Sequence, residues 1–171
     1  MVKVRQYHSP KDYLDAAGSD ETTAEELMFL AGSEYDFVRL AVAGNPNVTS
    51  GILSILVPDA LSSWNKQAIA LALAQNARTS PAVLRTLAEK LIPVLNKDRN
   101  GLAHEVAIKL FCNANTPFDV VQAVLNSREA TTLVRRKLAR ETIRKDALRL
   151  LAADRSEVVR KLALNRLEIL K

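Results

Sequence analysis

The sequence holds few side chains that could act as a nucleophile or as a general base. Its two histidines are His8 and His104, and its one cysteine is Cys112. A catalytic Cys–His pair requires the two side chains to meet. The eight residues that separate His104 from Cys112 are near two helical turns, which could align them on one helix. Cys112 falls near a predicted helix end, and we interpret it as a buried structural cysteine, the usual state of this small apolar side chain.

No other catalytic or metal-binding motif is complete. His104–Glu105 lacks the second histidine of a zinc metalloprotease helix, and the five glycines are isolated, so they form no phosphate-binding loop or nucleophile elbow. The segment from Asp12 to Asp36 contains eight acids and no base, without the spacing of a calcium-binding loop. We interpret these acids as a solvated face. The sequence therefore predicts a protein that is not an enzyme and that has no metal or cofactor site.

A DNA-repair enzyme built from helical repeats is an alternative, because such an enzyme uses an acidic residue and aromatic walls around a flipped base. Trp64 and the three tyrosines, Tyr7, Tyr13 and Tyr35, would have to supply these walls. All four lie in the first 64 residues, outside the basic half of the chain. This enzymatic alternative therefore ranks third, behind protein binding and nucleic-acid binding.

Positive charge is concentrated in the C-terminal third. The net charge is +5, yet residues 128–171 carry 13 basic and six acidic side chains, whereas the first 127 residues are net negative. Arg136, Arg140 and Arg144 are spaced four apart, so a single helix through them would present one stripe of guanidinium groups. Guanidinium groups bind phosphate in bidentate fashion and with salt-sensitive affinity.

The candidate polyanion-binding site consists of this stripe and the basic residues on neighbouring turns: Arg135, Arg136, Lys137, Arg140, Arg144, Lys145, Arg149, Arg160 and Lys161. Two alternatives stay open. The cations could form an ordinary solvated face, partly paired with nearby acids, that covers apolar surface at the end of the molecule. They could instead bind an acidic protein partner.

These residues must be positioned by helices, because four stretches share a pattern that marks the start of a helix. Each opens with a hydroxyl residue that can cap a helix and continues with apolar residues spaced three or four apart. The stretches are TTAEELMFLA from Thr22, TSGILSILV from Thr49, SPAVLRTLAEK from Ser80 and TPFDVVQAVL from Thr116. Pro81 and Pro117 suit a first helical turn, and Thr23 with Glu26 predicts a capping box. In the third stretch, Leu84 is a predicted core position.

A second apolar element accompanies each of these helices. Five such elements align at anchors spaced 31, 37, 28 and 24 residues apart: Val38, Ile69, Val106, Val134 and Val158. The same alignment brings four asparagines into one column, from which Glu141 departs: Asn45, Asn76, Asn113 and Asn165. Asparagine tolerates the left-handed conformation at a helix C-terminus, so the column predicts helix ends.

Helical pairs this small cannot bury their apolar faces alone and must stack on one another. We therefore predict an all-α solenoid of about five short repeats in a single domain, residues 1–171. The approximate repeats are residues 12–36, 37–66, 67–104, 105–132 and 133–165, with insertions at Pro58–Lys66 and Lys90–Gly101. Residues 131–164 contain no Gly, Pro or Asn, so either two short helices or one bent helix fits there.

The phrase VRLAVAGNPNVTSGILSILVPD resembles the unit of the leucine-rich repeat variant family, V-R-x-A-V-A-x-N-P followed by a short loop and an apolar helix ending in an acid. LARETIRKDALRLLAADRSEVVRKLALN is similar, with Glu141-Thr142 in place of Asn-Pro. The resemblance covers roughly residues 12–165 and implies a right-handed superhelix of alternating α-helices and short or 3-10 helices. Some relatives bind an iron–sulfur centre through an N-terminal cysteine cluster. This chain lacks those cysteines, so no cofactor is carried over.

The composition is that of a globular chain, with 48% hydrophobic residues, no apolar run that could span a membrane and no apolar signal-peptide stretch at its N-terminus. A single cysteine excludes a disulfide framework. We therefore expect a cytoplasmic and monomeric protein. The predicted function is that of a non-enzymatic binding module or scaffold that holds a macromolecular partner, with a protein partner favoured and nucleic acid as the alternative.

Overall fold

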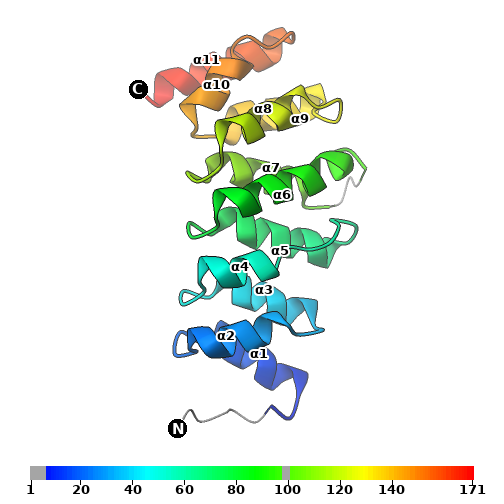
Figure 1. Cartoon of the computed structure of the whole chain (residues 1–171). Coiled ribbons are helices and arrows are strands. Elements are labelled where there is room, and N and C mark those ends of the chain that lie inside the picture. Colours follow the sequence, from blue (N-terminus) through cyan, green and yellow to red (C-terminus); the bar gives the residue numbers. More distant parts are fainter. Residues whose placement is uncertain (1–6, 98–100) are drawn as a thin grey trace.

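The computed structural model describes residues 7–97 and 101–171, and every element in these ranges is helical. Eleven α-helices and one 3-10 turn follow one another along this part of the chain (Figure 1). The all-α class predicted from the sequence is therefore confirmed. None of the described helices is both long and apolar enough to cross a membrane.

The helices form two layers. In the first layer each helix packs on the next: α1 (Pro10–Gly18), α3 (Asp36–Gly44), α5 (Trp64–Gln75), α7 (Ala103–Cys112), α9 (Thr132–Glu141) and α11 (Glu157–Ile169). The second layer contains α2 (Ala24–Ala31), α4 (Ser50–Ile55), α6 (Pro81–Leu91) with the 3-10 turn η1 (Ile92–Val94), α8 (Phe118–Asn126) and α10 (Lys145–Leu151). The helices stack along one axis, with α1 and α11 at opposite ends (Figure 1).

The second layer consists of short α-helices rather than the 3-10 helices that the family resemblance allows. These helices are six to eleven residues long. The one 3-10 turn of the described chain follows α6 at Pro93, whose missing N–H cannot continue the α-helical hydrogen bonds. Residues 131–164 form α9, α10 and the first part of α11. Residues 98–100, within the predicted insertion at Lys90–Gly101, lie outside the described residues.

Three of the predicted helix starts are confirmed. In each, the side-chain oxygen accepts a hydrogen bond of 3.3 to 3.4 Å from the amide three residues later, and the capping residues are Thr23, Thr49 and Ser80. The predicted start at Thr116 is wrong, because Pro117 is the residue that precedes α8. The buried Thr116 hydroxyl instead donates at 2.6 Å to the carbonyl of Leu110, so it fastens the turn to the end of α7.

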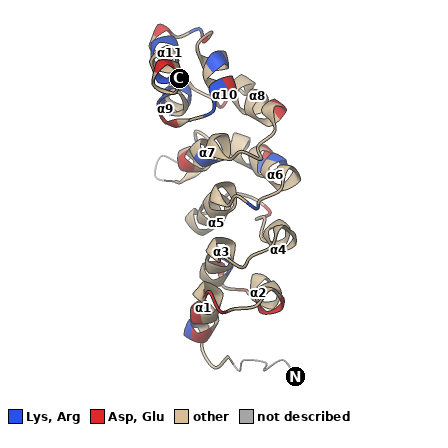
Figure 2. Ribbon diagram, turned by 90° about the vertical axis from the view of Figure 1, so that its left-hand side faces the viewer, with Lys and Arg blue, Asp and Glu red and all other residues tan. Residues whose placement is uncertain are grey.

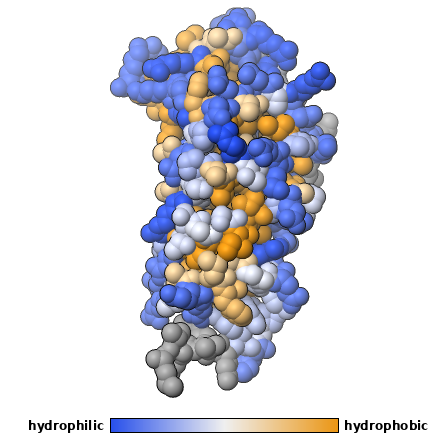
Figure 3. Space-filling view, in the orientation of Figure 1, coloured by the Kyte–Doolittle hydropathy of each residue, from blue (hydrophilic) through white to orange (hydrophobic). Residues whose placement is uncertain are grey.

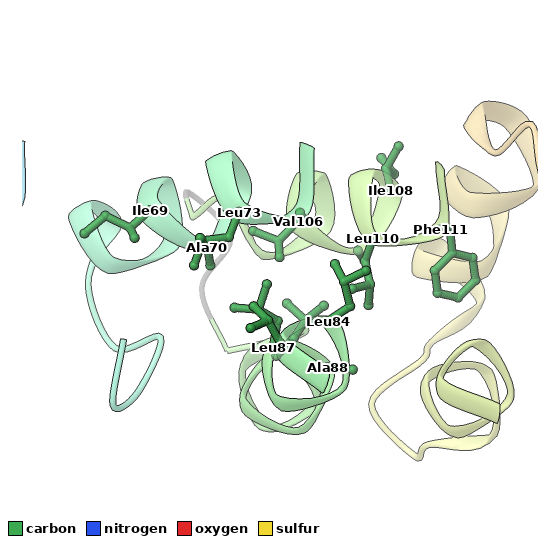
Figure 4. Packing of buried hydrophobic residues seen from close by; sticks show 14 of the residues in the cluster. Ile69, Ala70, Leu73, Leu84, Leu87, Ala88, Val106, Ile108, Leu110 and Phe111 are labelled. Atoms are coloured by element: carbon green, nitrogen blue, oxygen red, sulfur yellow. The ribbon is translucent and has the colours of Figure 1, made fainter. Parts of the chain in front are cut away.

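Leu84 is a core residue, as its periodicity predicts. It is fully buried in α6, and with Leu87 it points toward α5 and α7, which contribute Leu73 and Val106 (Figure 4). Leu84 and Leu87 therefore fill the space between two neighbouring first-layer helices. Burial of one leucine side chain stabilises the fold by about 1.5–3 kcal/mol.

Asn45, Asn76 and Asn113 directly follow α3, α5 and α7, as predicted, but not in the left-handed conformation. Their φ angles lie between −68° and −74°, with extended ψ. Each side-chain amide instead donates, at 2.8 to 3.0 Å, to carbonyls at the end of the preceding first-layer helix: Asn45 to Ala17 and Ser19, Asn76 to Ala43, and Asn113 to Ala74 and Asn76. We call this series of bonds the asparagine ladder.

The last two first-layer helices depart from the predicted column. Thr142 takes the asparagine position after α9, where it is buried and accepts a hydrogen bond from the amide of Arg144 at 3.2 Å. Asn165 lies exposed inside α11, so its predicted role as a helix end is wrong. No second-layer helix follows α11 in the described chain, and Asn165 has no turn to form. The anchor of α11 is also shifted by one residue, because Val159 is buried and Val158 is exposed.

Candidate functional site

Arg135 is buried rather than presented at the surface. Its side chain is 7% exposed and forms an ion pair with Asp154, with Nε 2.6 Å from Oδ2, and it also donates to the carbonyl of Ala130. Burial raises the pKa of the Asp154 carboxyl, but hydrogen bonds from Arg135 and the Ser156 amide outweigh burial and hold this pKa below its ordinary value. The assignment of Arg135 to a polyanion-binding surface is therefore wrong. Arg135 instead joins α9 to the turn before α11.

Arg144 does not extend the predicted stripe of guanidinium groups. Helix α9 ends three residues before Arg144, which is the residue that precedes α10. The Nε of Arg144 lies 2.7 Å from the carboxylate of Asp146, and its Nη1 donates to the carbonyl of Thr116 in the preceding turn. Arg144 therefore stabilises the turn, and the stripe is reduced to Arg136 and Arg140.

Five of the predicted cations are exposed, and the four that form no ion pair within the described residues lie on two faces. Arg136 and Arg140 are exposed on α9, in the first layer, whereas Lys145 and Arg149 are exposed on α10, in the second layer. The two layers bury their inner faces against each other, so their exposed faces point in opposite directions. The structure thus divides these four residues into two pairs rather than bringing them together.

The other three predicted cations are more closely engaged with the fold. Lys137 is half-buried on α9, Arg160 donates to the carbonyls of Asp154 and Arg155, and Lys161 forms an exposed ion pair with Glu157 at 2.7 Å. Figure 2 shows basic and acidic residues interspersed over the α9–α11 end of the molecule. Much of this positive charge is therefore matched locally.

His104 and Cys112 do not form a catalytic pair. Nε2 of His104 lies 2.9 Å from the carbonyl oxygen of Leu95, whereas the Cys112 thiol donates at 3.8 Å to the carbonyl of Glu141, the last residue of α9. Cys112 is the last residue of α7 and is partly exposed, so its predicted burial is wrong. Its hydrogen-bond partner is a backbone carbonyl rather than a catalytic side chain. Among the described residues, no three His, Cys, Asp or Glu side chains are grouped closely enough to hold a metal ion.

Five aromatic side chains stack at the α1 end of the molecule. The ring centroids of Tyr7 and Tyr13 are 4.3 Å apart, and those of Tyr13 and Phe29 are 6.5 Å apart. Tyr35 meets Tyr13 edge-on at 6.4 Å and stacks on Phe37 at 5.3 Å. The rings therefore form one continuous group across α1, α2 and α3, which we call the aromatic cluster. Each such pair contributes about 0.5–1.5 kcal/mol beyond its buried area.

This cluster was not predicted from the sequence, although all three tyrosines lie near the N-terminus. One signal was available: Ser9 and Asp12 form a reciprocal capping box that fixes the start of α1. With α1 in place, Tyr7 lies close enough to α2 for its hydroxyl to donate to Glu26. Of the capping box predicted for Thr23 and Glu26, the structure shows one hydrogen bond. In this bond the backbone amide of Glu26 donates to the side-chain oxygen of Thr23.

A pocket of about 290 Å³ opens beside the aromatic cluster. The residues that line it come from α1, α2 and the turn before α3: Tyr13, Phe29, Leu30, Gly32, Ser33, Glu34 and Tyr35. Hydrogen bonding to Glu34 and the charge of its carboxylate raise the pKa of Tyr35 above the ordinary value for tyrosine. The Tyr35 hydroxyl therefore stays protonated at neutral pH, and Glu34 is the one acidic residue in the lining.

An exposed apolar surface continues from this pocket onto α4. Phe29 is 61% exposed, and Met28 and Ile55 are 45% and 54% exposed. Phe29 and Ile55 each follow a capping threonine by six residues, so they occupy equivalent places on adjacent second-layer helices. Figure 3 shows apolar residues gathered at the level of α4 and continuing toward α2. We call Met28, Phe29 and Ile55 the apolar patch.

No protein-family model, no curated protein and no solved structure matches this chain. Two surfaces of the molecule therefore bear on its function. One is the apolar patch with the aromatic cluster at the α1 end, and the other is the set of exposed cations on α9 and α10.

Proposed function

We propose that this chain is a non-enzymatic helical-repeat protein, a right-handed α-solenoid of the leucine-rich repeat variant type, that holds a protein partner. The stacked first-layer helices and the repeated bonds of the asparagine ladder support the solenoid. The unit VRLAVAGNPNVTSGILSILVPD, which spans α3 and α4, supports the family. We also propose that the protein is cytoplasmic and monomeric, as expected from the sequence.

The observation that carries protein binding is the exposed apolar patch beside the aromatic cluster. Covering apolar surface is favourable by about 25 cal/mol per Å², and aromatic and methionine side chains are enriched in protein interfaces. Phe29 already stacks on Tyr7, with centroids 5.9 Å apart. Its ring is therefore partly ordered before binding, which lowers the entropy cost of docking a partner.

Site-specific cross-linking in cells tests this function. A photoreactive amino acid in place of Ile55 reports what covers the apolar patch. The same replacement of Leu164 on α11 is the matched control, because this aliphatic side chain is exposed to a similar extent. We expect a defined protein adduct at Ile55 and none at Leu164, with the adduct lost in Phe29→Asp. Equal adducts at both positions, or none at Ile55, would show that the patch is not a docking surface.

Nucleic-acid binding is the second candidate, and Arg136 and Arg140 favour it. They are exposed one turn apart on α9, and neither forms an ion pair within the described part of the chain. Two phosphate contacts supply much less affinity than the roughly 6–10 contacts of a strong DNA-binding protein. Protein binding through the apolar patch is therefore the better-supported function.

A further inference from the structure

We propose that the pocket beside Phe29 receives an arginine or lysine side chain, so that the protein partner docks through a basic peptide segment. This inference rests on the function proposed above and adds the chemistry of the partner. Three properties of the pocket carry it: its aromatic walls, its size and the sign of the surrounding charge.

The walls of the pocket are aromatic ring systems in two orientations. Tyr13 and Phe29 lie nearly parallel, with 25° between their planes, whereas Tyr35 meets Tyr13 at 61°. A cation placed against the face of an aromatic ring is attracted by the negative charge of that face. The planar guanidinium of arginine can in addition stack on such a ring. An aliphatic or acidic side chain gains neither interaction.

The size of the pocket suits a single side chain. Pockets that enclose drug-sized ligands measure about 300–1,000 Å³, and this pocket, at about 290 Å³, lies at the lower limit. Its position also matters, because Phe29 belongs both to the pocket and to the apolar patch. A peptide that covers the patch therefore brings a neighbouring side chain to the pocket.

The charge around the pocket is negative. Glu34 lines it, and residues 12–36 contain eight acids and no base. Arg39, the next base along the chain, forms an ion pair with Asp36. Figure 2 shows that acids outnumber bases on α1 and α2, where Lys11 of α1 is the base, at the end of the molecule opposite α11. This field attracts a basic peptide and repels nucleic acid.

The test uses a flexible Gly-Ser peptide with evenly spaced arginines and the same peptide with citrulline, which keeps the shape of arginine but has no charge. Isothermal titration calorimetry on the full chain measures both affinities. We expect the arginine peptide to bind at least about tenfold more tightly, because citrulline loses both the cation–π attraction and the attraction to Glu34.

Two pocket variants and two matched controls locate the binding site. We expect Phe29→Ala and Glu34→Gln each to weaken arginine-peptide binding by about three- to tenfold. Phe118→Ala removes an exposed phenylalanine from α8, and Glu89→Gln removes an exposed acid from α6. Neither control should change the affinity. Circular dichroism and thermal unfolding of each variant establish that the fold is retained.

Several results would overturn the proposal. Equal affinities for the arginine and citrulline peptides would exclude a cation pocket, and unchanged binding in Phe29→Ala would place the cation elsewhere. Salt-sensitive self-association that Glu34→Gln abolishes would assign the pocket to the basic end of a second copy instead. A protein adduct at Ile55 without arginine-peptide binding would leave the proposed function standing and refute the cation pocket alone.

Discussion

The side-chain amide of Asn113 donates a 3.0 Å hydrogen bond to the backbone carbonyl of Asn76, which holds the equivalent place one helical pair earlier. Asn76 in turn donates to the carbonyl of Ala43, the residue before last in α3. Carbonyls at the C-terminal end of a helix lack partners within that helix. Each asparagine therefore satisfies the end of the preceding first-layer helix while it terminates its own.

This relationship predicts a stability loss on replacing Asn113 with alanine. The change leaves the carbonyls of Ala74 and Asn76 and the amide of Asn115 without the bonds that Asn113 provides. Leaving buried polar groups unpaired costs about 1–3 kcal/mol, which urea unfolding can measure. Asn165→Ala, at an exposed position inside α11, is the control and should change stability by less than about 0.5 kcal/mol. Equal losses in the two variants would contradict the role of the ladder.

A second prediction concerns the core. Leu84→Ala should destabilise the fold by about 2–5 kcal/mol, because the fully buried side chain fills the space between α5 and α7 and leaves a cavity when it is shortened. Leu164→Ala removes the same atoms from an exposed position on α11 and should have little effect. Denaturant midpoints of both variants check this prediction. A loss below about 0.5 kcal/mol for Leu84→Ala would be inconsistent with the packing.

A third prediction follows from the Arg135–Asp154 ion pair. The folded pKa of Asp154 lies below the unfolded value of about 3.9. The pair therefore contributes stability that is present above the unfolded pKa and is lost as the pH falls through the folded pKa. Asp154→Asn should cost about 3–5 kcal/mol at neutral pH, because it leaves the buried Arg135 charge unpaired.

Unfolding free energies measured from neutral pH down to about pH 3 test this, since the variant should lose part of the acid dependence of the wild type. Glu157→Gln is the control, because the exposed pair of Glu157 with Lys161 is worth at most about 1 kcal/mol. An Asp154→Asn protein with wild-type stability and an unchanged pH profile would refute the structural role of the ion pair.

A fourth prediction concerns nucleic acid. If Arg136 and Arg140 contact phosphates, replacing both with glutamine should lower the log–log salt slope of duplex binding by about 1.8, or about 0.9 for each contact. Lys145→Gln with Arg149→Gln is the control on the opposite face and should leave the slope unchanged. Fluorescence anisotropy over a salt series measures the slope. Absence of wild-type binding at low salt would exclude the nucleic-acid function, because low salt screens charges least.

Three helix starts were predictable from the sequence because a capping hydrogen bond depends only on residues close together in the chain. Thr49 and Ser80 each bond an amide only three residues away. By contrast, Asn113 and Asn165 are the same residue type in similar local sequence, yet Asn113 follows the end of α7 and bonds the end of α5, whereas Asn165 lies inside α11. The different roles of Asn113 and Asn165 depend on how the helices stack, and a pattern within one short segment carries no information about stacking.

The candidate sites also depend on contacts between residues that are far apart in the sequence. Arg135 and Arg136 are adjacent in a basic stretch, yet the first is buried and the second is exposed. The partner of Arg135 is Asp154, 19 residues further along the chain, so sequence spacing alone gave no reason to remove Arg135 from the surface. The aromatic cluster likewise draws its rings from three helices, and it becomes a feature only when α1, α2 and α3 are in contact.

The stacking of each first-layer helix on its immediate neighbours also determines how the molecule opens. Because α1 and α11 each pack on only one first-layer helix within the described residues, local unfolding of this part of the chain should begin at these two helices and advance inward. Amide hydrogen exchange should therefore be fastest in α1 and α11 and slowest around α5 and α7. A partner held by Phe29 and Ile55 would bridge α2 and α4 close to one of these fraying ends. Bound partner would then slow exchange at that end first, while the α11 end continued to exchange at its own rate.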